Sequence, residues 1–269
     1  MWKKIRILIS WVLLIAYFSV SMSFVAKQTD DCRFNKIDIQ FTDNSTHYFV
    51  DKDEILSIIQ TDSAKILGSK LESVNINKIE NILIKHPSIL SVEVYILSNG
   101  TLKIEVQQRN PIVRIFAEDN SFYIDETGVI MPLSEDYTAR VLIANGNLNI
   151  NDKNIIGKNI QNFNDSTKSE YLLKKIFKIA DFIYRDKLWN SQIVQVSVSD
   201  YNDFELVPLV GDQIIKFGDL DQIKNKFTKL KSLYLKGFNN LGWKSYKEIN
   251  LKYNNQVVCS KNENYEPVN

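Results

Sequence analysis

A long uncharged segment near the amino terminus is the feature that most constrains this chain. The 20 residues from Ile7 to Ala26 contain no charged side chain, and most of them are apolar. In a helix that rises about 1.5 Å per residue, such a segment matches a hydrocarbon core of about 30 Å. We therefore expect residues 1–27 to form a short cytoplasmic stub and a transmembrane anchor.

Charges beside this segment predict its orientation. Lys3, Lys4 and Arg6 precede it, whereas Asp30 and Asp31 follow it. Cytoplasmic flanks of membrane spans carry an excess of lysine and arginine, so we expect the amino terminus in the cytoplasm. The rest of the chain is then exported, and the protein crosses the membrane once.

A cleaved signal peptide is the alternative interpretation of the same segment. Ser19, Ser21 and Ser23 resemble the small residues of a processing site. The apolar core of a signal peptide usually spans only about 7 to 15 residues, whereas Phe24 and Val25 extend this one. We therefore favour an uncleaved anchor.

The exported part, after Lys27, is nearly balanced in charge. It holds 29 basic and 32 acidic residues, a net charge of −3. Nucleic-acid-binding proteins present an excess of positive charge, so we expect no nucleic-acid partner. Cys32 and Cys259 form neither a metal-ligand spacing nor a dense disulfide framework. We interpret them as isolated thiols, and a long-range bridge between them stays open.

The first exported segment has the pattern β-α-α-β-β. Period-two alternation of apolar residues predicts strands, and apolar stripes after capping residues predict helices. The expected elements are a strand over 36–41, a helix that begins near Asp51, a helix that begins near Asn75 or Asn77, and strands over 91–97 and 101–106. Between the last two strands, Asn99 and Gly100 predict a type I′ hairpin turn, in which both central residues have positive φ.

The second exported segment is predicted to be rich in strands, with two helices. Asp125 to Gly128 has the composition of a turn between two short strands, and residues 145–165 are expected to form an exposed loop. Helices are expected from Thr167 and over about 220–236. The expected strands are 111–116, 122–124, 129–131, 140–144, 193–198, 204–209, 213–217 and 246–253.

Three stretches together resemble the FtsQ/DivIB cell-division family. KHPSILSVEVYILSNGTLKIEVQQRNPIVRI (85–115) is similar to the passage from a POTRA domain into the family's β domain. FYIDETGVIMPLS (122–134) and EINLKYNNQVVC (248–259) are similar to two of its hairpins. The resemblance implies an α+β protein with a transmembrane helix, a β-α-α-β-β POTRA domain and a mixed β-rich domain. The expected boundaries are 33–110 for the POTRA domain, 111–259 for the FtsQ-type β domain and 260–269 for a tail.

Motifs for catalysis or metal binding are absent from the sequence. His47 and His86 have no Cys, Asp or Glu at a metal-ligand spacing, and no phosphate-binding loop or nucleophile elbow follows a predicted strand. Asp125 and Glu126 are explained by the turn before Gly128. We therefore expect no enzyme activity, cofactor, metal or small-molecule substrate.

The resemblance implies a membrane-anchored scaffold of the bacterial divisome, located in the cytoplasmic (inner) membrane at the septum. It implies FtsB-like and FtsL-like division proteins as partners of the β domain, and other septal proteins as partners of the POTRA domain. We expect a partner to bind by strand addition to the edge of the sheet. The residues predicted to form that edge are Glu248, Ile249, Asn250, Leu251, Lys252 and Tyr253. Their alternation predicts that Ile249, Leu251 and Tyr253 face the core and that the other three face solvent.

Two other functions stay open at this point. A POTRA-containing accessory of polypeptide transport or outer-membrane assembly would be expected to carry tandem POTRA units or a barrel region. A membrane-anchored cell-wall hydrolase would be expected to release fragments from peptidoglycan.

Overall fold

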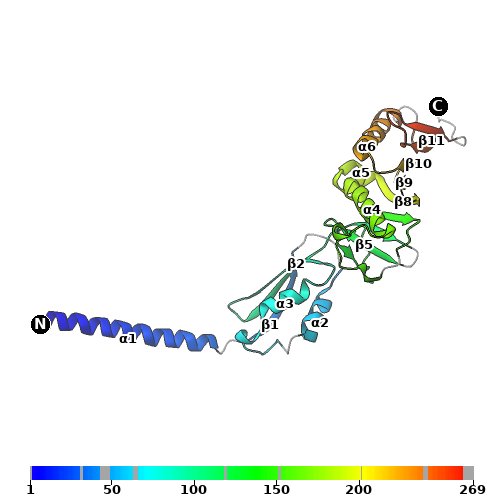
Figure 1. Ribbon diagram of the computed structural model, residues 1–269. Helices are drawn as coiled ribbons and strands as arrows, with labels where there is room; N and C mark the ends of the chain where they lie inside the picture. The colour runs from blue at the N-terminus through cyan, green and yellow to red at the C-terminus, as the bar shows by residue number, and fades with distance from the viewer. Residues whose placement is uncertain are drawn as a thin grey trace. The chain divides into compact units, whose positions relative to one another are not determined.

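The computed structural model describes residues 2–30, 33–42, 49–62, 66–117, 120–150, 153–200, 202–238 and 242–262 (Figure 1). Contacts divide the chain into two compact units. The first unit comprises residues 1–43, 51–85 and 91–107, and the second comprises residues 44–50, 86–90 and 108–269. His47 and Cys32 lie outside the described residues.

The amino-terminal segment forms the long helix α1 (Trp2–Asp30). Among the described residues, one helical stretch is long and apolar enough to cross a membrane, the 19 residues Lys4–Met22. Its large apolar side chains, such as Trp11, Leu13 and Phe18, are exposed. A helix whose apolar residues have no protein partner fits a lipid environment. Retention of this helix in the mature protein stays a prediction.

The first unit has the predicted β-α-α-β-β order. A short 3₁₀ helix, η1 (Leu71–Ser73), lies between its two α-helices. The sheet has the order β1-β3-β2, with β1 parallel to β3. The elements are β1 (Lys36–Phe41), α2 (Lys52–Asp62), α3 (Ile76–Leu83), β2 (Ile89–Ile96) and β3 (Thr101–Gln108).

Both helices of this unit begin where the capping residues predict. The side chain of Asp51 accepts a hydrogen bond from the backbone N–H of Glu54 at 2.7 Å. The side chain of Asn75 accepts one from the N–H of Lys78 at 3.0 Å. Each bond satisfies an amide that the first helical turn leaves without a partner.

The turn between β2 and β3 differs from the prediction. Gly100 has a φ of +79°, but Asn99 is not among the residues with positive φ, so the turn is not type I′. The N–H of Gly100 donates to the carbonyl of Leu97 at 2.9 Å, and the N–H of Leu97 donates to the carbonyl of Thr101 at 2.9 Å. These bonds belong to a three-residue hairpin loop that ends in a left-handed glycine.

The second unit is built on one nine-stranded sheet in the order β12-β11-β10-β9-β8-β7-β4-β5-β6. The pairs β4–β7, β7–β8 and β10–β11 are parallel, and the other described pairs are antiparallel. The strands are β4 (Pro111–Phe116), β5 (Ser121–Asp125), β6 (Ile130–Met131), β7 (Leu142–Gly146), β8 (Ile193–Asp200), β9 (Asp203–Pro208), β10 (Ile214–Gly218), β11 (Tyr246–Asn250) and β12 (Val258–Lys261).

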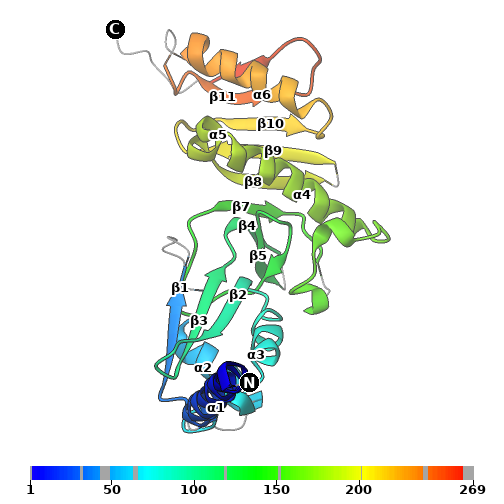
Figure 2. The ribbon, with the colours of Figure 1, turned by 90° about the vertical axis from the view of Figure 1, so that its left-hand side faces the viewer.

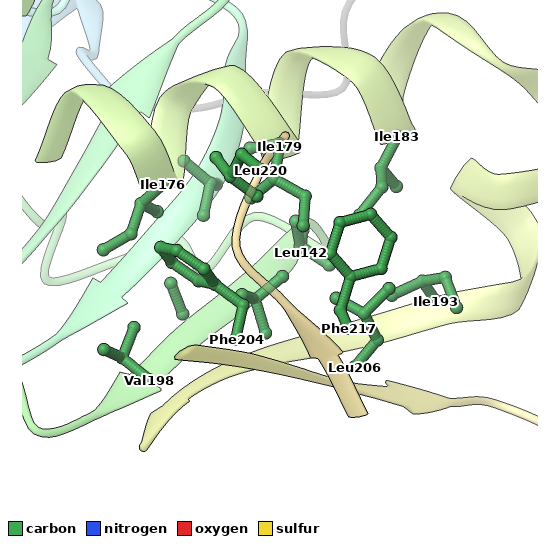
Figure 3. Packing of buried hydrophobic residues seen from close by; sticks show 14 of the residues in the cluster. Leu142, Ile176, Ile179, Ile183, Ile193, Val198, Phe204, Leu206, Phe217 and Leu220 are labelled. Carbon is green, nitrogen blue, oxygen red and sulfur yellow. The ribbon is translucent and has the colours of Figure 1, made fainter. Parts of the chain in front are cut away.

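Three α-helices of this unit lie over one face of the sheet (Figure 2). They are α4 (Lys168–Arg185), α5 (Lys187–Gln192) and α6 (Ile223–Ser232), and α6 continues into the short π-helix η4 (Leu233–Gly237). On α4, Ile176, Ile179 and Ile183 point toward the sheet, where Phe204 and Phe217 complete the buried core (Figure 3). The fold class is α+β, as the sequence predicts.

Helix α5 is absent from the prediction. Asp186 caps it, because its carboxylate accepts hydrogen bonds from the N–H groups of Leu188 and Trp189. Trp189 is buried and contacts the rings of Phe227 and Tyr234. The helix has only six residues, so its apolar stripe is too short to be recognised as a helical period.

The predicted exposed loop over 145–165 is only partly exposed. It contains the short 3₁₀ helices η2 (Lys153–Ile155) and η3 (Ile160–Asn162). Leu148, Ile150 and Ile160 are buried in the main core. The prediction was wrong for these residues because isolated apolar side chains among many asparagines show no periodicity.

Candidate functional site: the closing hairpin of the second unit

Strand β11 lies inside the sheet. It pairs in parallel with β10 on one side and antiparallel with β12 on the other. The prediction that residues 248–253 form the edge was therefore wrong. After β11 the chain turns at Asn254 and Asn255, where Asn255 has a φ of +61°, and returns as β12. The returning strand covers the side of β11 that the prediction assigned to a partner.

The apolar residues of the predicted set divide between core and surface. Ile249 and Leu251 are fully buried, as predicted. Tyr253 is 50% exposed, so the prediction that it faces the core was wrong. The strand ends at Asn250, and Tyr253 already belongs to the turn, where strand alternation no longer sets the direction of side chains.

The polar residues of the predicted set hold the hairpin in place. Glu248 forms an ion pair with Lys216 of β10, with 3.0 Å between Oε2 and Nζ. The hydrogen bond that the Lys216 ammonium donates to this carboxylate raises the pKa of Lys216. The side chain of Asn250 accepts a hydrogen bond from the N–H of Lys252 at 3.0 Å. The Nζ of Lys252 pairs with Asp203 of β9 at 2.7 Å.

Helix α6 fixes the turn of the hairpin. The Nζ of Lys229 donates to the backbone carbonyls of Tyr253 at 2.8 Å and Gln256 at 3.4 Å. Burial lowers the pKa of Lys229, and the nearby charge of Lys226 adds to this effect. The turn is therefore tied to the body of the unit, which pre-positions β12.

Strand β12 ends the sheet in the part of the chain that the structure describes. Val258 is 42% exposed, and Ser260 and Lys261 are also exposed. Cys259 lies opposite Ile249, has a free thiol and is half-buried against the core. Sequence reasoning recognised the hairpin up to Cys259 but did not assign its second strand.

The direction of the backbone groups of β12 follows from one hydrogen bond. The N–H of Asn262 donates to the carbonyl of Ser245, on the side of β11. Backbone groups alternate in direction along a strand, so the N–H of Ser260 also faces β11. The N–H groups of Cys259 and Lys261 then face away from the sheet.

The opposite end of the sheet is covered. The N–H of Ile130 in β6 donates to the carbonyl of Lys158 at 3.0 Å, and the N–H of Gly157 donates to the carbonyl of Ile130 at 2.8 Å. Val129 and Asn159 form a further bridge. Among the described residues, β12 is therefore the end of this sheet at which the backbone is not covered by another segment.

Comparison with known families matches both units. A family model described as FtsQ/DivIB, C-terminal related, matches residues 110–260, which is more than half of the chain. A model of a POTRA-like domain matches residues 32–107. This chain belongs to the FtsQ/DivIB family. A search of curated proteins found no match.

The other candidate residues of this FtsQ/DivIB protein have structural roles. Asp125, 1% exposed, accepts hydrogen bonds from the N–H groups of Thr127 and Val129, which explains the predicted turn. It also forms an ion pair with Arg109 at 2.8 Å, a partner that sequence spacing did not reveal. His86 accepts a hydrogen bond from the N–H of Ser88 through Nδ1. Within the described residues, no group of His, Cys, Asp and Glu is arranged to hold a metal ion.

Proposed function

We propose that this FtsQ/DivIB protein is a non-enzymatic scaffold of the bacterial divisome that binds its partner by strand addition to β12. Family membership supports a role among division proteins. The observation that carries the proposal is the end of the nine-stranded sheet that no other described segment covers, at a strand that follows a turn held by ion pairs and hydrogen bonds.

Strand addition supplies both affinity and selectivity. A partner segment pairs with the outward backbone groups of Cys259 and Lys261, and its own side chains alternate between the two faces of the sheet. Because the hairpin is already ordered, the partner alone loses conformational entropy on binding.

The proposed partners are FtsB-like and FtsL-like division proteins at the β domain, and other septal proteins at the POTRA domain. The proposed location is the cytoplasmic (inner) membrane at the septum, with a cytoplasmic amino terminus. Helix α1 and its lysines and arginine support this orientation. The proposed domains are 33–110 and 111–259, after an anchor over 1–27.

Depletion in the native organism tests this function. Filaments without septa, reversed by the wild-type gene, are the expected result. Normal septa with defects of the outer membrane would instead support an accessory of transport or outer-membrane assembly. For the enzyme alternative, the purified full chain should release no fragment from peptidoglycan.

A further inference from the structure

The second unit contains a surface cavity of about 630 Å³ that is far larger than a single water site. It lies between the segment after β7, the segment that contains η2 and η3, and the first turns of α4. It shares no residue with the closing hairpin. A ligand here would therefore be independent of a partner on β12.

Four asparagines form most of the uncharged polar lining. They are Asn147, Asn149, Asn162 and Asn164, in two pairs that come from opposite segments. Within the described residues, none of the four side-chain amides forms a hydrogen bond with the protein. Each amide offers two donor hydrogens and an acceptor oxygen, so the lining has a large unused capacity for hydrogen bonds.

The charges of the lining cancel. Lys158 and Lys168 are balanced by Glu170 and Asp200. Such a lining gives no net attraction for an anion or a cation, and a neutral ligand fits it best.

The floor of the cavity is apolar. Ile150, Ile155, Leu172 and Leu173 are buried beneath it, and the ring of Phe163 is half-buried against the same core. A ligand that fits both features has apolar C–H faces and many neutral hydroxyl or amide groups. The walls come from loops and a helix, so they offer no strand edge to which an extended peptide could add.

We propose that this cavity binds a neutral saccharide. The four amides hydrogen-bond adjacent hydroxyl and N-acetyl groups, and the apolar floor contacts the C–H face of a sugar ring. The site adds a ligand to a chain whose sequence predicts no small-molecule substrate. It requires no chemistry at the sugar, only binding.

Saturation-transfer NMR tests the proposal with the full chain in micelles of a detergent without a sugar head group. The probe is the trisaccharide of N-acetylglucosamine. A neutral tetrapeptide is tested in the same way as the alternative class of ligand. The site variant is Asn147→Ala with Asn162→Ala. The matched control is Asn190→Ala, an exposed asparagine of α5 that does not line the cavity.

The expected result is transfer to the trisaccharide in the wild type and in Asn190→Ala, with Kd weakened at least about tenfold in the site variant. Asn164→Ala is an independent second variant, which decides the matter if the double variant melts early. No transfer in the wild type would overturn the proposal. So would equal binding by the site variants, or transfer to the tetrapeptide alone.

Discussion

Ile249 of β11 lies opposite Cys259 of β12 in an antiparallel pair. Because Ile249 is fully buried and Cys259 half-buried, this pair extends the core toward the end of the sheet. Asn250 pairs with Val258 in the same ladder. A proline at Asn250 would therefore disturb the hairpin itself, and the residues that test partner binding lie on β12.

Gly100 should tolerate no side chain. A Cβ atom at this position would lie 2.6 Å from the backbone carbonyl oxygen of Arg33, and the φ of +79° disfavours any other residue. We expect Gly100→Ala to lower the free energy of unfolding by about 2 kcal/mol or more, with strain and clash added together. Thermal melting of the full chain in detergent measures the effect.

Gly68 supplies the matched control for this variant. Its φ is +84°, but a Cβ atom there would meet nothing within 4 Å. Gly68→Ala should therefore cost only the backbone strain, about 1 kcal/mol. Equal melting temperatures for the two variants would contradict the proposed clash with Arg33.

Loss of the Asp125 carboxylate should destabilise the second unit strongly. Asp125→Ala leaves Arg109 without its partner and leaves the N–H groups of Thr127 and Val129 without an acceptor. We expect a loss of about 3 to 5 kcal/mol, as for other buried ion pairs that lose one partner. Urea unfolding of the full chain provides the measurement.

The ion pair of Asp181 with Arg185 is an exposed counterpart on helix α4, at 2.7 Å. Asp181→Ala should cost only about 0.3 to 0.5 kcal/mol, because water screens the pair. If Asp125→Ala were as mild as Asp181→Ala, the buried pair would not organise the turn as described.

Tyr234 should make the second unit sensitive to alkaline pH. Burial raises the pKa of its phenol to about 12, and the nearby side chain of Gln213 opposes part of this rise. Above the unfolded-state pKa of about 10 the unfolded chain releases this proton while the folded protein keeps it, so stability falls as pH rises from 10 toward 12.

Tyr234→Phe removes the phenol and therefore its contribution to the pH dependence of stability. Near neutral pH we expect little loss of stability, since the hydroxyl is buried without a well-formed hydrogen bond. Between pH 9 and pH 11.5 the variant should lose about 2 kcal/mol less than the wild type in urea unfolding. The other tyrosines are present in both proteins, so their titration does not affect the difference between the two. Identical dependence of stability on pH would show that Tyr234 does not contribute.

The anchor should be retained and should depend on its apolar character. Intact mass of the native protein is expected to include residues 1–27, and a start near Ser23 would show that the segment is cleaved. Leu14→Arg places a charge within the Lys4–Met22 stretch, at a cost of about 2.5 to 3.5 kcal/mol for insertion. The yield of membrane-bound protein should fall accordingly.

Sequence rules that involve only a few neighbouring residues predicted where helices begin. Asn75 and Thr167 cap helices at the expected positions, because a cap involves only the next three residues. Features that depend on distant residues were missed. Arg109, just before β4, pairs with Asp125 at the end of the neighbouring β5, and the place of β11 inside the sheet depends on where the returning chain pairs.

The edge of the sheet was predicted one strand too early. The alternation of apolar and polar residues identified Ile249 and Leu251 as buried. Such alternation arises whenever one face of the sheet is covered. Periodicity reports which face of a strand is covered and carries no information about its two edges. For that reason the four residues of β12 were not recognised as the edge.

Binding of the FtsB-like partner to two variants of Lys261 tests the central claim most directly. Lys261→Pro removes a backbone N–H that faces away from the sheet, whereas Lys261→Ala removes the charge and keeps the N–H. Full-length variants are compared with the wild type in a pull-down, after circular dichroism shows equal folding. We predict that Lys261→Ala retains binding and that Lys261→Pro loses most of it. Equal binding by a folded Lys261→Pro protein would contradict strand addition at β12.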